Sequence, residues 1–241
     1  MLCMKISIIV PCYNESRNIK NNVECKIIPF MDNLNIEYEI IIVNDGSKDD
    51  TGEIIKTIKN VKAVSYTPNR GKGGAVKEGI MHAEGDYILF MDADLSTDLC
   101  AIHDVINNMG KYDLIIGSRH MKDSKLVQKQ PLIRQFIGYM CRKLVNMKFH
   151  MHYKDTQCGF KAIKTEYAKE FANRQIINNF AFDVEYLYIA RLNNLTAVEL
   201  PVIWENDLSS TVKIASSSLK FLKDMNLIKK NKSNYIFKET K

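Results

Sequence analysis

Short apolar runs alternate with amphipathic stretches through the first half of the 241-residue chain. The runs are rich in Ile and Val and continuous in hydrophobicity, as expected of strands buried on both faces of a sheet. The predicted strands cover residues 6–10, 40–43, 61–66, 87–91 and 114–116, and the helices between them cover 16–33, 51–59, 74–83 and 98–109. This alternation predicts an α/β fold with a mostly parallel sheet flanked by helices.

The second half of the chain is less regular. Helices are predicted over residues 131–148, 165–173, 182–194 and 216–230, with a strand at 197–204 and a loop or strand at 155–161. Pro131 suits the first turn of its helix, because a proline N–H would lack a partner there anyway. We find no internal repeat, linker or domain boundary, so residues 1–230 are expected to form a single domain and residues 231–241 a frayed tail.

Composition narrows the class of protein. With 46% hydrophobic and 26% charged residues, the chain is neither disordered nor collagen-like. Its six cysteines are scattered without a CxxC pair, which indicates reduced thiols in a cytosolic protein and no zinc site. No run approaches the roughly 18 apolar residues of a spanning helix, and the apolar run before Pro11 is too short for a signal peptide.

The net charge of +6 is unevenly distributed. Residues 1–119 carry 13 basic and 17 acidic side chains, a net charge of −4, whereas residues 120–241 carry 21 and 11, a net charge of +10. An acidic first half suits the binding of a metal or a ribose. A basic second half suits phosphate or an anionic membrane surface.

Polar loops follow each predicted strand of the first half, where ligands bind in sheets of this kind. Asp92 and Asp94 directly follow the most apolar strand, and two such carboxylates suit Mg²⁺ or Mn²⁺ with substrate phosphates completing the shell. The structural alternative for this acidic pair is a helix N-cap. Asp45 can accept hydrogen bonds from a nucleoside, although Asn44-Asp45-Gly46 is also a strong turn sequence.

The glycine-rich segment 69–74, which contains Lys72, could hold a phosphate on backbone N–H groups at the start of a helix. It is neither a Walker loop nor a dinucleotide-binding GxGxxG. The alternative is a simple turn from strand to helix.

Together these motifs resemble the family 2 glycosyltransferases, which have the Rossmann-like GT-A fold. The resemblance over residues 5–119 rests on Pro11-Cys-Tyr-Asn-Glu15, Val43-Asn-Asp-Gly-Ser47, Asn69-Arg-Gly-Lys-Gly73 and Phe90-Met-Asp-Ala-Asp-Leu95. Further motifs resemble the dolichyl-phosphate β-glucosyltransferases, with bacterial polyprenyl-phosphate glycosyltransferases and dolichyl-phosphate mannose synthases as close kin. They are Gly117-Ser-Arg119, Asp155-Thr-Gln-Cys-Gly-Phe-Lys161, Phe182-Asp-Val-Glu185 and Pro201-Val-Ile-Trp204.

The resemblance implies an inverting hexosyltransferase that uses a nucleotide diphosphate sugar, with UDP-glucose favoured, and a polyprenyl or dolichyl phosphate acceptor. Residues 1–119 would bind the nucleotide sugar and residues 120–230 the acceptor. The implied nucleotide-sugar residues are Pro11, Tyr13, Glu15, Asp45, Lys72 and Asp92, and Mg²⁺ or Mn²⁺ would lie on Asp92 and Asp94. Arg119, Arg134 and Lys213 would bind the acceptor phosphate.

By family position, Asp155 and Asp183 are candidates for a general base, beside Asp94, Arg119 and Arg134 as catalytic residues. A phosphate acceptor is already ionised near neutral pH, so a base is not required. Asp155 could instead orient Arg119 or Arg134, and Asp183 could cap the helix that follows it. The structural role is favoured for Asp183, and both roles stay open for Asp155.

The resemblance also implies a lipid acceptor that the chain must reach. Relatives commonly carry a membrane anchor that this sequence lacks, and Ser96 stands where several relatives have Gln. The basic amphipathic stretches 131–148 and 216–230 could lie in the membrane interface, which predicts a cytoplasmic protein held peripherally on the cytoplasmic face of a membrane. Nucleic-acid binding is disfavoured because exposed aromatics do not interleave with the basic residues.

Two other functions stay open at this stage. One is transfer to a hydroxyl of a cell-surface glycan or a teichoic-acid-like polymer, for which Asp183 would be the base. The other is a catalytically degenerate, membrane-associated scaffold. The donor sugar, the metal and the oligomeric state are not determined by these patterns.

Overall fold

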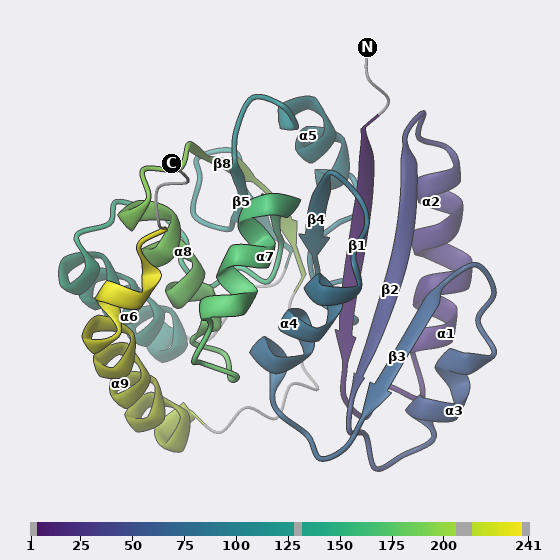
Figure 1. Cartoon of the computed structure of the whole chain (residues 1–241), viewed down its shortest axis with the longest axis horizontal. Helices are drawn as coiled ribbons and strands as arrows, with labels where there is room; N and C mark the ends of the chain where they lie inside the picture. The colour runs from purple at the N-terminus through teal and green to yellow at the C-terminus, as the bar shows by residue number, and fades with distance from the viewer. Residues whose placement is uncertain (1–3, 128–131, 206–213, 238–241) are drawn as a thin grey trace.

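The computed structural model describes residues 4–127, 132–205 and 214–237 (Figure 1). Its main sheet has seven strands in the order β3-β2-β1-β4-β7-β5-β8. They are β1 (Lys5–Cys12), β2 (Glu37–Asp45), β3 (Lys62–Tyr66), β4 (Tyr87–Phe90), β5 (Leu114–Ser118), β7 (Lys161–Lys164) and β8 (Ala197–Pro201). All neighbouring strands pair in parallel except β7, which is antiparallel to both β4 and β5. The predicted α/β class with a mostly parallel sheet is confirmed.

Helices cover both faces of this sheet. They are α1 (Ile19–Asn22), α2 (Ile28–Asp32), α3 (Thr51–Lys56), α4 (Lys72–His82), α5 (Ala101–Asn108), α6 (Leu132–Phe149), α7 (Thr165–Arg174), α8 (Phe182–Leu192) and α9 (Ile214–Lys230). A π-helical turn, η1 (Val23–Ile27), joins α1 to α2 just before Pro29, whose ring would clash with the carbonyl of a regular α-helical turn.

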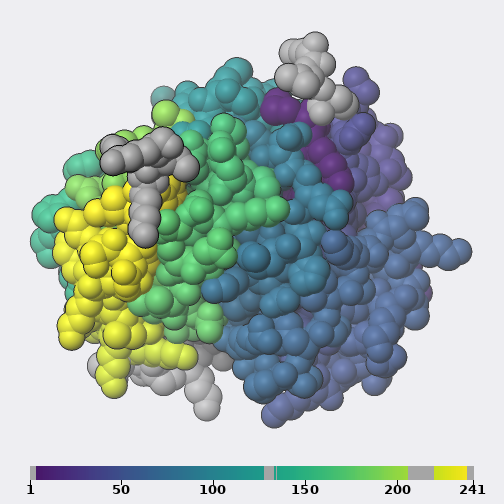
Figure 2. Space-filling model, viewed as in Figure 1, coloured from purple at the N-terminus to yellow at the C-terminus, as the bar shows by residue number. Residues whose placement is uncertain are grey.

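The strands bury alternate residues in two cores, because successive side chains point to opposite faces. Ile8 and Ile42 pack with α1, α3 and α5 on one face, whereas Ile9 and Ile41 pack with α4, α7 and α8 on the other. Figure 2 shows the first half, purple to blue, joined without a gap to the green and yellow second half. The continuous apolar runs predicted from the sequence are confirmed as strands buried on both faces.

Two parts of the second half differ from the prediction. The expected strand at 197–204 divides at Val202 into β8 and β9 (Ile203–Trp204), and β9 pairs with β6 (Lys125–Leu126) away from the main sheet. The predicted fraying from Asn231 is wrong for residues 231–237. There a 3₁₀ turn, η2 (Lys232–Tyr235), buries Tyr235, whose hydroxyl donates a 2.5 Å hydrogen bond to Glu185.

Candidate active site

The candidate site lies at the carboxyl ends of the parallel strands. In Figure 1, β1 to β4 run downward, so these ends are at the bottom of the sheet. Four of the loops singled out in the sequence follow β1, β2, β3 and β4 there. β7 runs the opposite way and therefore begins at this edge, with Lys161 paired to Phe90 of β4. The segment that leads into β7 thus reaches the same edge, and it brings residues of the second half to the acidic loops of the first.

Asp92 and Lys72 form an ion pair at the centre of this edge. Lys72 is the first residue of α4 and is placed there by Gly71, whose φ of 97° favours glycine. Burial acts to lower the pKa of Lys72, but the carboxylates of Asp92 and Asp183 raise it above its ordinary value. Lys72 is therefore a cation at neutral pH, and its charge is paired with Asp92.

Asp94 lies beside Asp92, but its carboxylate has a different partner. The Ser96 backbone N–H donates to it over 2.9 Å, and the Ser96 hydroxyl donates as well. Burial, followed by the charge of Asp92, raises the pKa of Asp94. A cation between the two carboxylates would relieve that repulsion, and Mg²⁺ is commonly held by one or two carboxylates with substrate phosphates. Both aspartates fit such a metal, although the described residues contain no cluster of three or more potential ligands.

Asp183 does not cap α8, contrary to one of the roles considered for it. The helix has Ala181 at its N-cap and no side-chain cap. The Asp183 carboxylate instead accepts a 2.5 Å hydrogen bond from the fully buried ammonium of Lys161. Burial raises the pKa of Asp183, while the charges of Lys161 and Lys72 act to lower it. The pairing supplies a counter-charge for a buried lysine, which supports the structural role favoured for Asp183.

Arg119 and Asp155 form a bidentate pair. Arg119 Nε and Nη2 lie 2.7 and 3.0 Å from the two carboxylate oxygens, and the Arg119 backbone N–H donates over 3.0 Å. Asp155 is fully buried, and burial alone would raise its pKa, but the Arg119 charge and hydrogen bonds hold that pKa well below its usual range. Such a carboxylate is a poor base. The alternative in which Asp155 orients Arg119 is the one the geometry supports.

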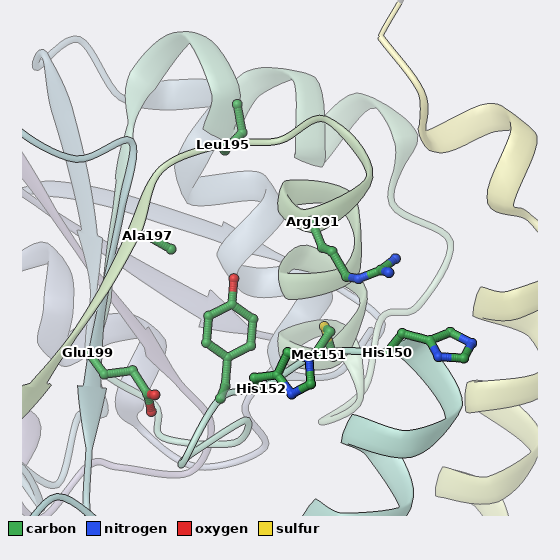
Figure 3. Close-up of a pocket in the computed structure, with 8 residues that line it drawn as sticks. His150, Met151, His152, Arg191, Leu195, Ala197 and Glu199 are labelled. Carbon is green, nitrogen blue, oxygen red and sulfur yellow. The ribbon is translucent and has the colours of Figure 1, made fainter.

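Glu199 on β8 supports this pair from behind. Its carboxylate accepts 2.9 Å hydrogen bonds from the backbone N–H groups of Lys154 and Asp155. Glu199 also lines a hollow of about 420 Å³ at the β8 edge. Figure 3 shows Glu199 and Ala197 on one side of the hollow and Arg191 of α8 on another, with His150 and His152 nearby. The residues that line this hollow, between positions 150 and 199, are far in sequence from the acidic loops that follow β1, β2 and β4. None of them belongs to a motif of the candidate site.

Asp45 holds the segment that leads to Lys72. One carboxylate oxygen accepts from the Tyr66 hydroxyl at 2.8 Å and from Arg70 N at 2.7 Å, and the other from Asn69 Nδ2 at 2.9 Å and Gly71 N at 2.8 Å. Four donors occupy its four lone-pair positions. The structure thus brings Asp45 to the site as an organiser of the 69–71 segment.

Pro11, Tyr13 and Glu15 lie at the end of β1. Their loop is tied to the loop after β2, because Asn14 N donates to Ser47 Oγ at 2.9 Å and Glu15 N to Thr51 Oγ1 at 2.8 Å. The Tyr13 side chain is 41% exposed, which leaves its ring available to a planar base.

Arg142 on α6 is a residue that motif reasoning did not select. It is half-buried, burial lowers its pKa, and it interacts with the charges of Asp155 and Arg119. Its position on an amphipathic helix gave no signal beyond its charge. Lys213 and the side chain of Arg134 lie outside the described residues.

Two further possibilities, a thiol nucleophile and a membrane-spanning helix, can be checked in the described structure. Burial raises the pKa of the Cys158 thiol to about 11, so the thiol is protonated at neutral pH. Within residues 4–127, 132–205 and 214–237, no helix has both the length and the apolar character needed to cross a membrane.

Two proteins with similar sequences match most of the chain. The chain is 36% identical to a dolichyl-phosphate β-glucosyltransferase of Dictyostelium discoideum over 91% of its length and 72% of that protein. It is 30% identical to the Saccharomyces cerevisiae protein of the same name over 93% of its length and 74% of that protein.

Among solved structures, glucosyl-3-phosphoglycerate synthase from Mycobacterium tuberculosis, in complex with Mn²⁺, UDP and phosphoglyceric acid, superimposes with a TM-score of 0.68. The match covers 98% of this chain and 80% of that one at 13% identity, and it shows a shared fold. The family described as Glycosyl transferase family 2 matches residues 7–171. The chain belongs to this family, and it is a glycosyltransferase related to the dolichyl-phosphate glucosyltransferases.

Proposed function

We propose that the chain transfers glucose from UDP-glucose to a polyprenyl or dolichyl phosphate, with inversion at the anomeric carbon. The observation that carries this proposal is the pairing of both base candidates, Asp155 with Arg119 and Asp183 with Lys161. A hydroxyl acceptor needs a carboxylate that is free to take a proton, whereas a phosphate acceptor arrives ionised. The names of the relatives at 30–36% identity support the same acceptor and sugar.

The donor would bind on the first half of the chain. Pro11, Tyr13 and Glu15 would line the nucleoside, with Asp45 shaping the adjoining segment rather than reaching the base itself. Lys72 would face the diphosphate. Asp92 and Asp94 would hold Mg²⁺ or Mn²⁺, which when bound neutralises charge on the leaving diphosphate.

The acceptor would bind on residues 120–230 and on Arg119, which directly precedes them. Arg119, held in plane by Asp155, would bind the acceptor phosphate, together with Arg142, Arg134 and Lys213. A phosphate oxygen would then attack the anomeric carbon from the side opposite the diphosphate. The new C–O bond forms as the bond to the UDP oxygen breaks, and UDP leaves with the electron pair. The site would act by positioning both anions and by stabilising charge.

A membrane surface would supply the acceptor. On α6, large apolar side chains face solvent: Ile133 is 70% exposed, Phe136 64% and Met147 71%. The exposed basic residue Lys143 lies on the same helix, whereas Arg142 is half-buried and interacts with Asp155. A helix of this composition lies in the membrane interface with its apolar residues inserted. We therefore propose that the chain lies peripherally on the cytoplasmic face of a membrane. Its single catalytic domain would extend beyond residue 230 to residue 237, because Tyr235 is buried in the core.

Purified protein should be assayed with detergent-solubilised polyprenyl phosphate, Mg²⁺ or Mn²⁺, and labelled UDP- and GDP-sugars. We expect a lipid-extractable, acid-labile product from UDP-glucose, which is lost in Asp94→Ala. Transfer to a glycan hydroxyl without a lipid product would overturn the acceptor, and product from another sugar would overturn the donor. UDP binding without any transfer would favour a scaffold.

A further inference from the structure

A buried carboxylate on α8 has partners that the transfer reaction does not use directly. Glu185 is 0% exposed. It accepts hydrogen bonds from Ile176 N at 2.8 Å, Ile177 N at 3.0 Å and the Tyr235 hydroxyl at 2.5 Å. One carboxylate therefore ties the loop between α7 and α8 to the last turn of the described chain.

That loop also binds the turn at the start of α4. Gln175 Nε2 donates to Gly73 O at 2.9 Å, and Gln175 Oε1 accepts from the Tyr186 hydroxyl at 2.6 Å. In return, Gly74 N donates to Asn178 O at 3.0 Å. Two hydrogen bonds, one from the Gln175 amide and one to the Asn178 carbonyl, join the loop to the turn, and Tyr186 of α8 fixes the other polar atom of the Gln175 amide.

The two segments also pack without spare room. A methyl group on Gly71 would lie 2.5 Å from Asn178 O, and one on Gly73 would lie 2.7 Å from Phe182 Cβ. Distances this short leave no room for a side chain at either glycine, so the loop cannot move toward the turn without displacing it. Lys72, the cation paired with Asp92, stands between these two glycines.

We infer that Glu185 is a positioning residue for Lys72: it holds the α7–α8 loop, and the loop holds the turn that directs the Lys72 ammonium toward Asp92. The link to catalysis rests on the proposed function, in which Lys72 faces the donor diphosphate. The positioning itself rests on the hydrogen bonds and close approaches above. Glu185 touches neither substrate, so its loss should affect the donor and not the acceptor.

Two variants test this role. Glu185→Gln removes the charge at nearly constant volume, and Tyr235→Phe removes one donor while leaving the carboxylate and its two backbone partners. The matched control is Glu166→Gln on α7, an exposed glutamate paired with Lys164. Hydrogen exchange of the Gly74 amide is followed by mass spectrometry, together with thermal unfolding, UDP affinity and the KM for each substrate.

In Glu185→Gln we expect the Gly74 amide to exchange about tenfold faster and the donor KM to rise about tenfold, with the acceptor KM unchanged. Tyr235→Phe should show both effects in weaker form, and it carries the test if Glu185→Gln does not fold. Unchanged exchange in a folded variant overturns the positioning role. Faster exchange with unchanged UDP affinity and donor KM overturns the link to Lys72. If wild-type protein transfers no sugar from any donor, the proposed function fails, and the exchange result still decides the positioning.

Discussion

Gly159 places its backbone directly against the Asp92 carboxylate. A methyl group on Gly159 would overlap Asp92 Oδ2 and would lie 2.7 Å from Lys72 Nζ. The segment before β7 thus packs against the central ion pair of the site. Asp92 and Gly159 are far apart in the sequence: 66 residues lie between them, including β5 and α6.

Gly159→Ala should therefore abolish transfer, because the methyl group displaces Asp92 or Lys72. We expect UDP affinity to fall more than tenfold, since a misplaced carboxylate and ammonium cannot both serve the donor. Calorimetric titration with UDP and Mn²⁺ checks this. Gly138→Ala on α6 is the control, because a methyl group there lies 3.6 Å from Arg142 Nη1, an ordinary contact. Wild-type affinity in Gly159→Ala would show that this loop does not enclose the donor site.

Asp155→Asn should lower the free energy of unfolding by about 3 kcal/mol at neutral pH, because the Arg119 guanidinium loses its buried charge partner. The pKa of Asp155 is lower in the folded protein than in the unfolded chain. Its stabilisation is therefore complete above the ordinary aspartate pKa of about 3.9 and is lost as the pH falls below that value. Urea unfolding between about pH 2 and 7 should show a shallower acid dependence in the variant. An identical pH profile would contradict the pairing.

Asp183→Asn should destabilise the protein by about 3 kcal/mol, because it leaves the fully buried Lys161 without a counter-charge. Adding Lys161→Met should restore most of that stability, since no buried charge then remains unpaired. Turnover of the double variant should stay within about tenfold of wild type, whereas loss of a general base costs about 10²–10⁴-fold. Denaturant unfolding and initial rates check the two expectations. A restored fold with no turnover would return Asp183 to the base role.

Membrane contact by α6 can be tested at its exposed apolar residues. Phe136→Glu and Met147→Glu should each weaken binding to anionic vesicles about tenfold or more, because a large apolar side chain no longer leaves water. UDP affinity should not change. Met81→Glu on α4 is the control, a residue of comparable exposure at 51%. Vesicle co-sedimentation measures the effect, and equal loss in all three variants would remove α6 as the specific contact.

Much of the donor half was predictable from sequence because its signals are local. The strands of that half are continuous Ile- and Val-rich runs, and Asp92 and Asp94 follow one of them directly. The family and the α/β class are confirmed on that basis. Roles that depend on distant partners were not predictable. Nothing near Asp183 indicated a buried lysine 22 residues away. For Asp155 the sequence left both Arg119 and Arg134 open as partners, and the structure shows the pair with Arg119.

β7 was missed for a related reason. Its four residues, Lys161–Lys164, begin and end with lysine and give neither a continuous apolar run nor a long alternation. Burial of Lys161 is tolerable only because Asp183 of α8 supplies the opposite charge and Cys158 O a further acceptor. The Lys161 charge, which made the segment look unlike a buried strand in the sequence, is compensated by these tertiary contacts.

The reversed strand has a consequence for how the chain can be divided. β5 belongs to the first half in sequence, yet both of its sheet neighbours, β7 and β8, come from the second. A fragment that ends at residue 119 would therefore carry an orphan strand, and its complement would carry two strands without the one that joins them. The proposed boundary between a donor half and an acceptor half therefore cuts through one sheet, so each half is an incomplete folding unit and the two must fold together.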